Sequence, residues 1–100
     1  MLDCKITVVK VICHEDLKRL YENHIENACF MKEGDVFLSK NGQIPFGFCA
    51  EAWKSVQPVL IELASGKVGL YDNWMKNERT AVVSCNDGIR PVSFLIEAIV

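Results

Sequence analysis

The chain has 100 residues, half of them hydrophobic and 24% charged, with a formal net charge of −2. These values indicate a single globular domain over residues 1–100 that buries its own core, and they exclude a disordered chain. The charge balance offers no basic surface for nucleic acid, and no apolar run approaches the ~20 residues of a membrane span. The first residues lack the basic segment and apolar core of a signal peptide, so we expect a cytoplasmic protein with reduced thiols.

The first half of the chain predicts a strand, a helix and a second strand. Residues 5–12 are rich in β-branched side chains, which favour a strand. Residues 14–25 place apolar side chains at helical spacing, and this helix should end before Cys29. A turn at 32–35 then leads to a short strand at 36–39, which a turn containing glycine ends.

The second half predicts a helix, a loop and a hairpin. Residues 51–64 carry one broad apolar stripe and should form a helix, which Pro58 kinks or interrupts because it removes one backbone hydrogen bond. Residues 70–79 show neither helical nor strand periodicity and are predicted to be an ordered loop. Strands at 80–85 and 92–100 flank an Asn-Asp-Gly turn, so we expect them to pair as a hairpin.

These elements follow one another in the order β-α-β-α-β-β. The order predicts an α+β domain in which two helices pack on one face of a mostly antiparallel four-stranded sheet. The sheet edges of so short a chain would be exposed, which favours a homo-oligomer.

Cys49 lies between a loop that contains Pro45 and Gly47 and the start of the second predicted helix. The free backbone N–H groups and the dipole at a helix start favour a negative charge, and hence the thiolate form of a cysteine. The thiolate is the form that attacks electrophiles, oxidises or binds metal, so Cys49 is a candidate catalytic residue. The alternative is that Cys49 packs as a small hydrophobic residue, as free cysteines often do.

Cys85 ends a predicted strand immediately before the Asn-Asp-Gly turn. If Asp87 and Gly88 are the central turn residues, Cys85 faces Arg90 across the hairpin. The cation would favour the thiolate or would hold a small anionic ligand, which makes Arg90 a second candidate catalytic residue. The alternative is that this segment is only a well-formed hairpin turn.

Cys29 follows the first predicted helix, with His24 five residues earlier. One helical turn would bring the two together as ligands for zinc or as base and nucleophile, whereas a solvated histidine is the alternative. Cys4 and Cys13 lie at an odd separation along the first strand, and we interpret both as structural. The five cysteines cannot all pair within one chain, and they contain no Cys-x-x-Cys motif.

Four motifs follow one another along the chain: Lys32-Glu-Gly-Asp-Val-Phe37, Ile44-Pro-Phe-Gly-Phe-Cys49 with Ala52-Trp53, Trp74-Met75, and Cys85-Asn-Asp-Gly-Ile-Arg-Pro-Val92. In this order, and over nearly the whole chain, they resemble a family of small prokaryotic proteins of about this length that is known mainly as uncharacterised. The resemblance implies that cysteines recur at the positions of Cys29, Cys49 and Cys85, and do not recur at the other two. Ala50 stands where relatives often carry proline, which should change rigidity more than chemistry. The family offers no activity to transfer, but it selects three cysteines out of five.

Three thiols at the ends of elements suggest three hypotheses. In the preferred one, Cys29, Cys49 and Cys85 ligate an iron–sulfur cluster or zinc, with one position left open for a substrate, a water or a fourth ligand. In the second, Cys49 is a redox or nucleophilic thiol that Cys85 or Cys29 resolves. In the third, the protein is a small ligand-binding or protein-interaction module with structural cysteines. We prefer the metal hypothesis because it accounts for all three cysteines.

Overall fold

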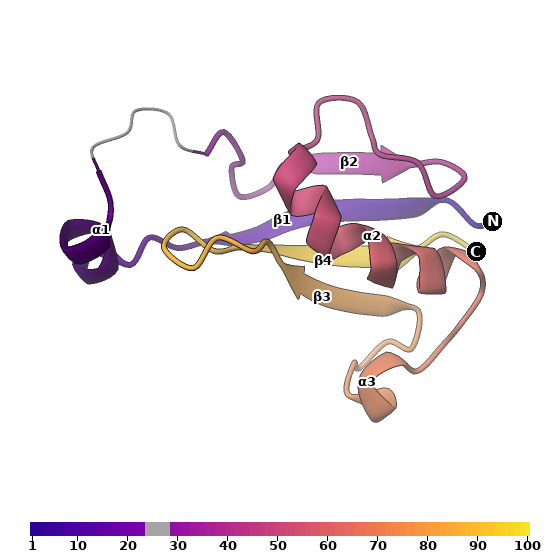
Figure 1. Cartoon of the computed structure of the whole chain (residues 1–100). Coiled ribbons are helices and arrows are strands. Elements are labelled where there is room, and N and C mark those ends of the chain that lie inside the picture. Colours follow the sequence, from indigo (N-terminus) through magenta and orange to yellow (C-terminus); the bar gives the residue numbers. More distant parts are fainter. Residues whose placement is uncertain (24–28) are drawn as a thin grey trace.

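The computed structural model describes residues 1–23 and 29–100. Its elements are β1 (Cys4–Val11), α1 (Glu15–Tyr21), β2 (Val36–Ser39), α2 (Ala50–Ala64), α3 (Leu70–Asn73), β3 (Thr80–Ser84) and β4 (Val92–Ala98). The strands form one sheet in the order β2-β1-β4-β3, and each neighbouring pair is antiparallel (Figure 1). The predicted α+β fold with an antiparallel four-stranded sheet is therefore confirmed.

The core lies between one face of the sheet and α2, which crosses that face (Figure 1). Successive side chains of a strand point to opposite faces, so alternate residues of the two central strands enter the core. The fully or almost fully buried residues of β1 and β4 are Cys4, Ile6, Val8, Val92, Phe94 and Ile96. From α2, the apolar stripe contributes Ala52, Val56, Leu60, Leu63 and Ala64. This core fixes the N-terminal end of α2 against the sheet.

Pro58 lies inside α2, yet the helix continues to Ala64. The expected interruption is therefore wrong. The proline is exposed, on the side of the helix that faces away from the sheet. Water can bond to the carbonyl that lacks a helical donor on that side, so the cost of the missing N–H is small.

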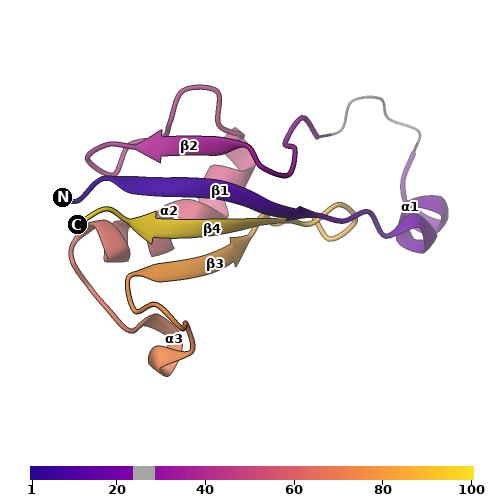
Figure 2. The ribbon, with the colours of Figure 1, turned by 180° about the vertical axis from the view of Figure 1, so that it is seen from behind.

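In one respect the prediction of two helices on one sheet face needs correction, because α1 does not pack on the sheet. None of the residues of α1 is buried, and Leu20 and Tyr21 are 64% and 78% exposed. Both views place α1 beyond the ends of the strands (Figures 1 and 2). The reason is the segment after β1, which stays bonded to the hairpin loop through Ile12 N–H to the Pro91 carbonyl and His14 N–H to the Ile89 carbonyl. The chain has thus left the sheet before the helix begins.

The segment predicted as an ordered loop contains the short element α3. Three consecutive residues, Tyr71, Asp72 and Asn73, have left-handed backbone angles, and Gly69 before them has a φ of 68°. An added Cβ at Gly69 would meet the Asn73 side chain, which would have to shift, and the positive φ there favours glycine. A left-handed turn has no helical side-chain periodicity, which explains why the sequence shows none here.

None of the described helices combines the length and the apolar character needed to cross a membrane.

Candidate functional site

Three of the five cysteines line one pocket of about 350 Å³ at the N-terminal end of α2. They are Cys29, Cys49 and Cys85, the same three that the sequence singles out. The pocket is also lined by Glu51, Ala52, Asn86, Asp87 and Arg90. The fold therefore brings together three cysteines that lie 20 and 36 positions apart in the sequence. This spacing alone does not predict that they share a pocket.

Cys49 is the N-cap residue of α2 and is half-buried against the core. The preceding Phe48 holds it in place, because the Phe48 ring is buried and meets Phe37 and Trp53 edge to face, with ring centroids 5.0 and 5.9 Å apart. The Cys49 carbonyl accepts the Trp53 N–H at 3.0 Å, as an N-cap carbonyl should. Its side chain makes no capping hydrogen bond, so the sulfur stays free for other partners.

Cys85 is held at the end of β3 by hydrogen bonds to the backbone of the opposite strand. Its own N–H donates to the Val92 carbonyl at 2.9 Å, and its sulfur accepts the Val92 N–H at 3.3 Å. The thiol also contacts the Arg90 carbonyl at 3.8 Å. A backbone N–H directed at a sulfur stabilises negative charge there, as it does around metal-bound thiolates.

The expected Cys85–Arg90 pairing across a two-residue turn is wrong, because Cys85 stands opposite Val92. The loop is longer than a two-residue turn, since the Asp87 carboxylate accepts the N–H groups of Ile89 and Arg90 at 2.8 and 3.0 Å. These hydrogen bonds, led by that from Arg90, lower the pKa of Asp87. The sequence treats Asp87 only as a turn residue, although its carboxylate also lines the pocket.

Arg90 is already paired with a carboxylate. Its guanidinium donates to both oxygens of Glu22, with the Nη1–Oε2 bond at 2.7 Å, and the two side chains are only 13% and 15% exposed. The hydrogen bonds with Arg90 lower the pKa of Glu22, and the carboxylate in turn raises the pKa of Arg90. This bidentate pair ties the end of α1 to the hairpin loop. An anionic ligand of Arg90 would have to compete with Glu22.

Two further cysteines of the sequence analysis, Cys4 and Cys13, do not line this pocket. Cys4 is fully buried in the core, and burial, with a smaller effect from Asp3, raises the pKa of its thiol. Cys13 is exposed and does not line the pocket, and its interpretation as structural stays a prediction. His24 lies outside the described residues, and its predicted contact with Cys29 falls there with it.

The three pocket thiols share a pocket without converging on one point. Within residues 1–23 and 29–100, no three histidine, cysteine or acidic side chains are grouped as a metal ion would need them. Cys29 is exposed, and it follows directly on the residues that the structure does not describe. The donor set suits a soft metal, but at least one thiol has to move inward to complete a site.

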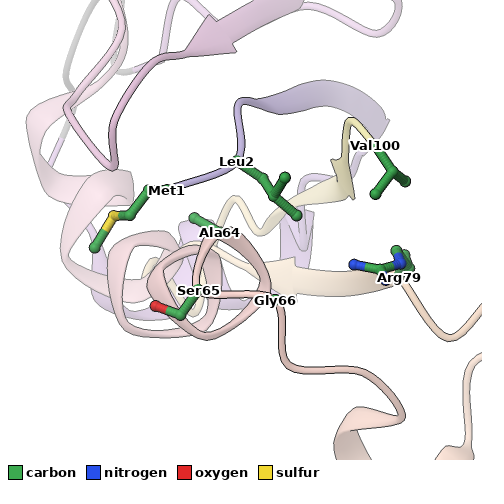
Figure 3. A pocket seen from close by; sticks show the side chains of 7 residues that line it. All are labelled: Met1, Leu2, Ala64, Ser65, Gly66, Arg79 and Val100. Atoms are coloured by element: carbon green, nitrogen blue, oxygen red, sulfur yellow. The ribbon is translucent and has the colours of Figure 1, made fainter.

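A larger cavity, of about 550 Å³, lies at the other end of α2 (Figure 3). Figure 3 shows it between the first residues of the chain, the last turn of α2 and Arg79 beside Val100. Among the described residues that line it, Arg79 has the one charged side chain, and none has a thiol or carboxylate side chain. We therefore choose the smaller pocket as the candidate site, because nucleophilic and acidic residues cluster there and not in the larger cavity.

The comparisons with known proteins add no relative. The chain matches no protein family model, no curated protein and no solved structure. The resemblance to a family of small prokaryotic proteins stays a prediction.

Proposed function

We propose that Cys29, Cys49 and Cys85 bind a thiolate-ligated metal centre, either a zinc ion or an iron–sulfur cluster. One observation carries the proposal: three cysteines from three separate segments line the same pocket of about 350 Å³. Thiolate is the ligand that zinc and iron–sulfur clusters share. Three such ligands leave one position open, which is typical of a reactive centre.

The surroundings of two of the sulfurs support this proposal. The Cys49 side chain stands at the N-terminus of a 15-residue helix, where the dipole and the free N–H groups stabilise an anion. The Cys85 sulfur accepts a backbone N–H from Val92, which orients it and stabilises its negative charge. Glu51 and Asp87 also line the pocket, but the Glu51 carboxylate pairs with Lys54 and the Asp87 carboxylate accepts two backbone N–H groups. Either carboxylate would have to leave these partners to fill the open position.

Binding should be coupled to a movement of Cys29. Cys49 is fixed by the cap of α2 and Cys85 by the two backbone bonds to Val92, whereas Cys29 is exposed and belongs to no helix or strand. The third ligand is therefore the one that can approach the other two. A metal would draw it inward and stabilise the folded state by the free energy of binding.

A thiol redox function is the second candidate, because the Cys49 sulfur is uncapped and shares its pocket with Cys85. A peroxide would oxidise the Cys49 thiolate to a sulfenic acid and release hydroxide. The Cys85 thiolate would then attack that sulfur, forming a disulfide and releasing a second hydroxide. The two thiolates thus lose two electrons in total, and the peroxide is reduced to two hydroxides.

The test is the absorption spectrum and elemental analysis of the full chain purified without air. We expect stoichiometric zinc without colour, or iron and sulfide with broad visible absorption. A metal-free protein whose pocket thiols titrate freely, under conditions where zinc or iron is supplied, would contradict the metal proposal. Mass spectrometry after addition of peroxide then distinguishes a Cys49–Cys85 disulfide from unreactive thiols.

A further inference from the structure

The face of the sheet opposite α2 is open. Figure 2 shows the sheet from that side, and none of the described helices crosses it. Antiparallel sheets often expose one face to water, and that face is then mostly polar. Here four aliphatic side chains, Val9, Val36, Leu38 and Val82, are 43–56% exposed on that face, beside polar residues such as Lys5, Ser93 and Glu97.

The strand registers place an apolar row across this face. Thr7 is opposite Val36 on one side and Leu95 on the other, and Leu95 is in turn opposite Val82. The row thus runs through all four strands, with one threonine among three aliphatic side chains. The next row on the same face consists of Leu38, Lys5, Glu97 and Thr80.

Lys5 and Glu97 are direct neighbours on the two central strands, β1 and β4. Their side chains form no ion pair with each other in the structure, although opposite charges at such positions can pair. The two central strands of the open face therefore carry one positive and one negative side chain, side by side near one end of the sheet.

We propose that a second copy of this chain packs on this face, with a two-fold axis parallel to the strands and midway between β1 and β4. Rotation about that axis places β1 over β4 of the partner and β2 over β3 of the partner. Lys5 then faces the partner's Glu97, and the same contact occurs a second time by symmetry. The apolar row also meets itself, because Val36 faces the partner's Val82 and Thr7 faces the partner's Leu95.

This arrangement agrees with how sheets pack. Two sheets that stack face to face keep their strands nearly aligned, and an axis parallel to the strands preserves that alignment. The charges favour a second copy over an unrelated partner, because Lys5 of each chain then faces Glu97 of the other chain. The face is formed by four short strands and is small beside the roughly 800 Å² per partner of a standard interface, so association should depend on concentration.

The test is analytical ultracentrifugation of the full chain over a range of concentrations, with Lys5→Glu and Glu97→Lys as single variants. We expect the unmodified chain to dimerise and each variant alone to associate at least about tenfold more weakly, because like charges then face each other twice. An equimolar mixture of the two variants should dimerise again. In the mixed dimer, the introduced glutamate faces the introduced lysine, and the native lysine faces the native glutamate.

The mixture distinguishes repulsion between two chains from repulsion within one chain. Each variant keeps its like-charged pair at positions 5 and 97 in the mixture, so recovery of the dimer can come only from contacts between the chains. Circular dichroism checks that both variants are folded. If either is not, Val82→Asp, at an exposed position of the apolar row, replaces them and should abolish dimerisation. The proposal is overturned if the unmodified chain or the mixture stays monomeric. It is also overturned if the dimer persists in the single variants, because a dimer that pairs through a strand edge would not depend on these charges.

Discussion

Replacing any one of Cys29, Cys49 and Cys85 by serine should abolish stoichiometric metal binding and leave the chain folded. Serine has nearly the shape of cysteine, but its neutral hydroxyl is a poor ligand for a soft metal. Two thiolates cannot hold a centre that needs three, so we expect metal content to fall to background rather than by a fraction. Elemental analysis of each variant, purified in parallel with the unmodified chain, is the measurement.

The chain offers a matched control in Cys13→Ser. Cys13 is exposed and does not line the pocket, so this variant should retain the full metal content. Equal loss of metal in the control would show that binding is to exposed thiols in general. Retention of metal by a pocket variant would show that the replaced cysteine is not a ligand.

Cys49→Ser adds a second signature. Serine is among the preferred N-cap residues, and the native Cys49 side chain makes no capping hydrogen bond. The metal-free variant should therefore be at least as stable as the metal-free unmodified chain, although it no longer binds metal. Loss of metal together with a lower melting temperature of the metal-free form would instead indicate a packing role for the thiol.

Phe94→Ala should lower the free energy of unfolding by about 3–5 kcal/mol, the range for a fully buried phenylalanine. Phe94 is completely buried on β4, the strand between β1 and β3, and its ring lies 5.2 Å from that of Phe48. Truncation leaves a cavity between the sheet and α2 that such a packed core cannot close. Chemical denaturation at equilibrium measures the change.

Phe46→Ala is the matched control, because Phe46 is fully exposed in the loop before α2. The same loss of atoms there should change the stability by no more than about 0.5 kcal/mol. Comparable destabilisation by both variants would contradict the placement of the core between α2 and the sheet.

Local sequence patterns predicted most of the fold. The β-branched run of β1, the apolar stripe of α2 and the short strand β2 each carry their own periodicity, and the structure forms them within one residue of the expected limits. The apolar spacing over residues 14–25 predicted a helix there, but the helix ends at Tyr21 and does not pack on the sheet. The backbone hydrogen bond from His14 to Ile89 determines where that helix lies. It joins segments far apart in the sequence, so the hydrophobic periodicity of either segment does not predict it.

The sequence predicted which cysteines line the candidate site, but it did not predict how the surrounding residues are arranged. The predicted ends of helices and strands identified Cys29, Cys49 and Cys85, and the resemblance selected the same three out of five. The Asn-Asp-Gly sequence is typical of a two-residue turn, and it misplaced Arg90 because the Asp87 side chain caps a longer loop. The pairing of Arg90 with Glu22, 68 residues away, depends on the tertiary fold and could not be read from either segment.

The measurement that tests the central claim most directly is X-ray absorption spectroscopy at the zinc edge of the zinc-loaded chain. Three thiolate ligands on one metal predict three sulfur scatterers at about 2.3 Å and one lighter scatterer at about 2.0–2.2 Å. A zinc shell of nitrogen and oxygen alone, or a chain that takes up neither zinc nor an iron–sulfur cluster, would contradict a three-cysteine metal site.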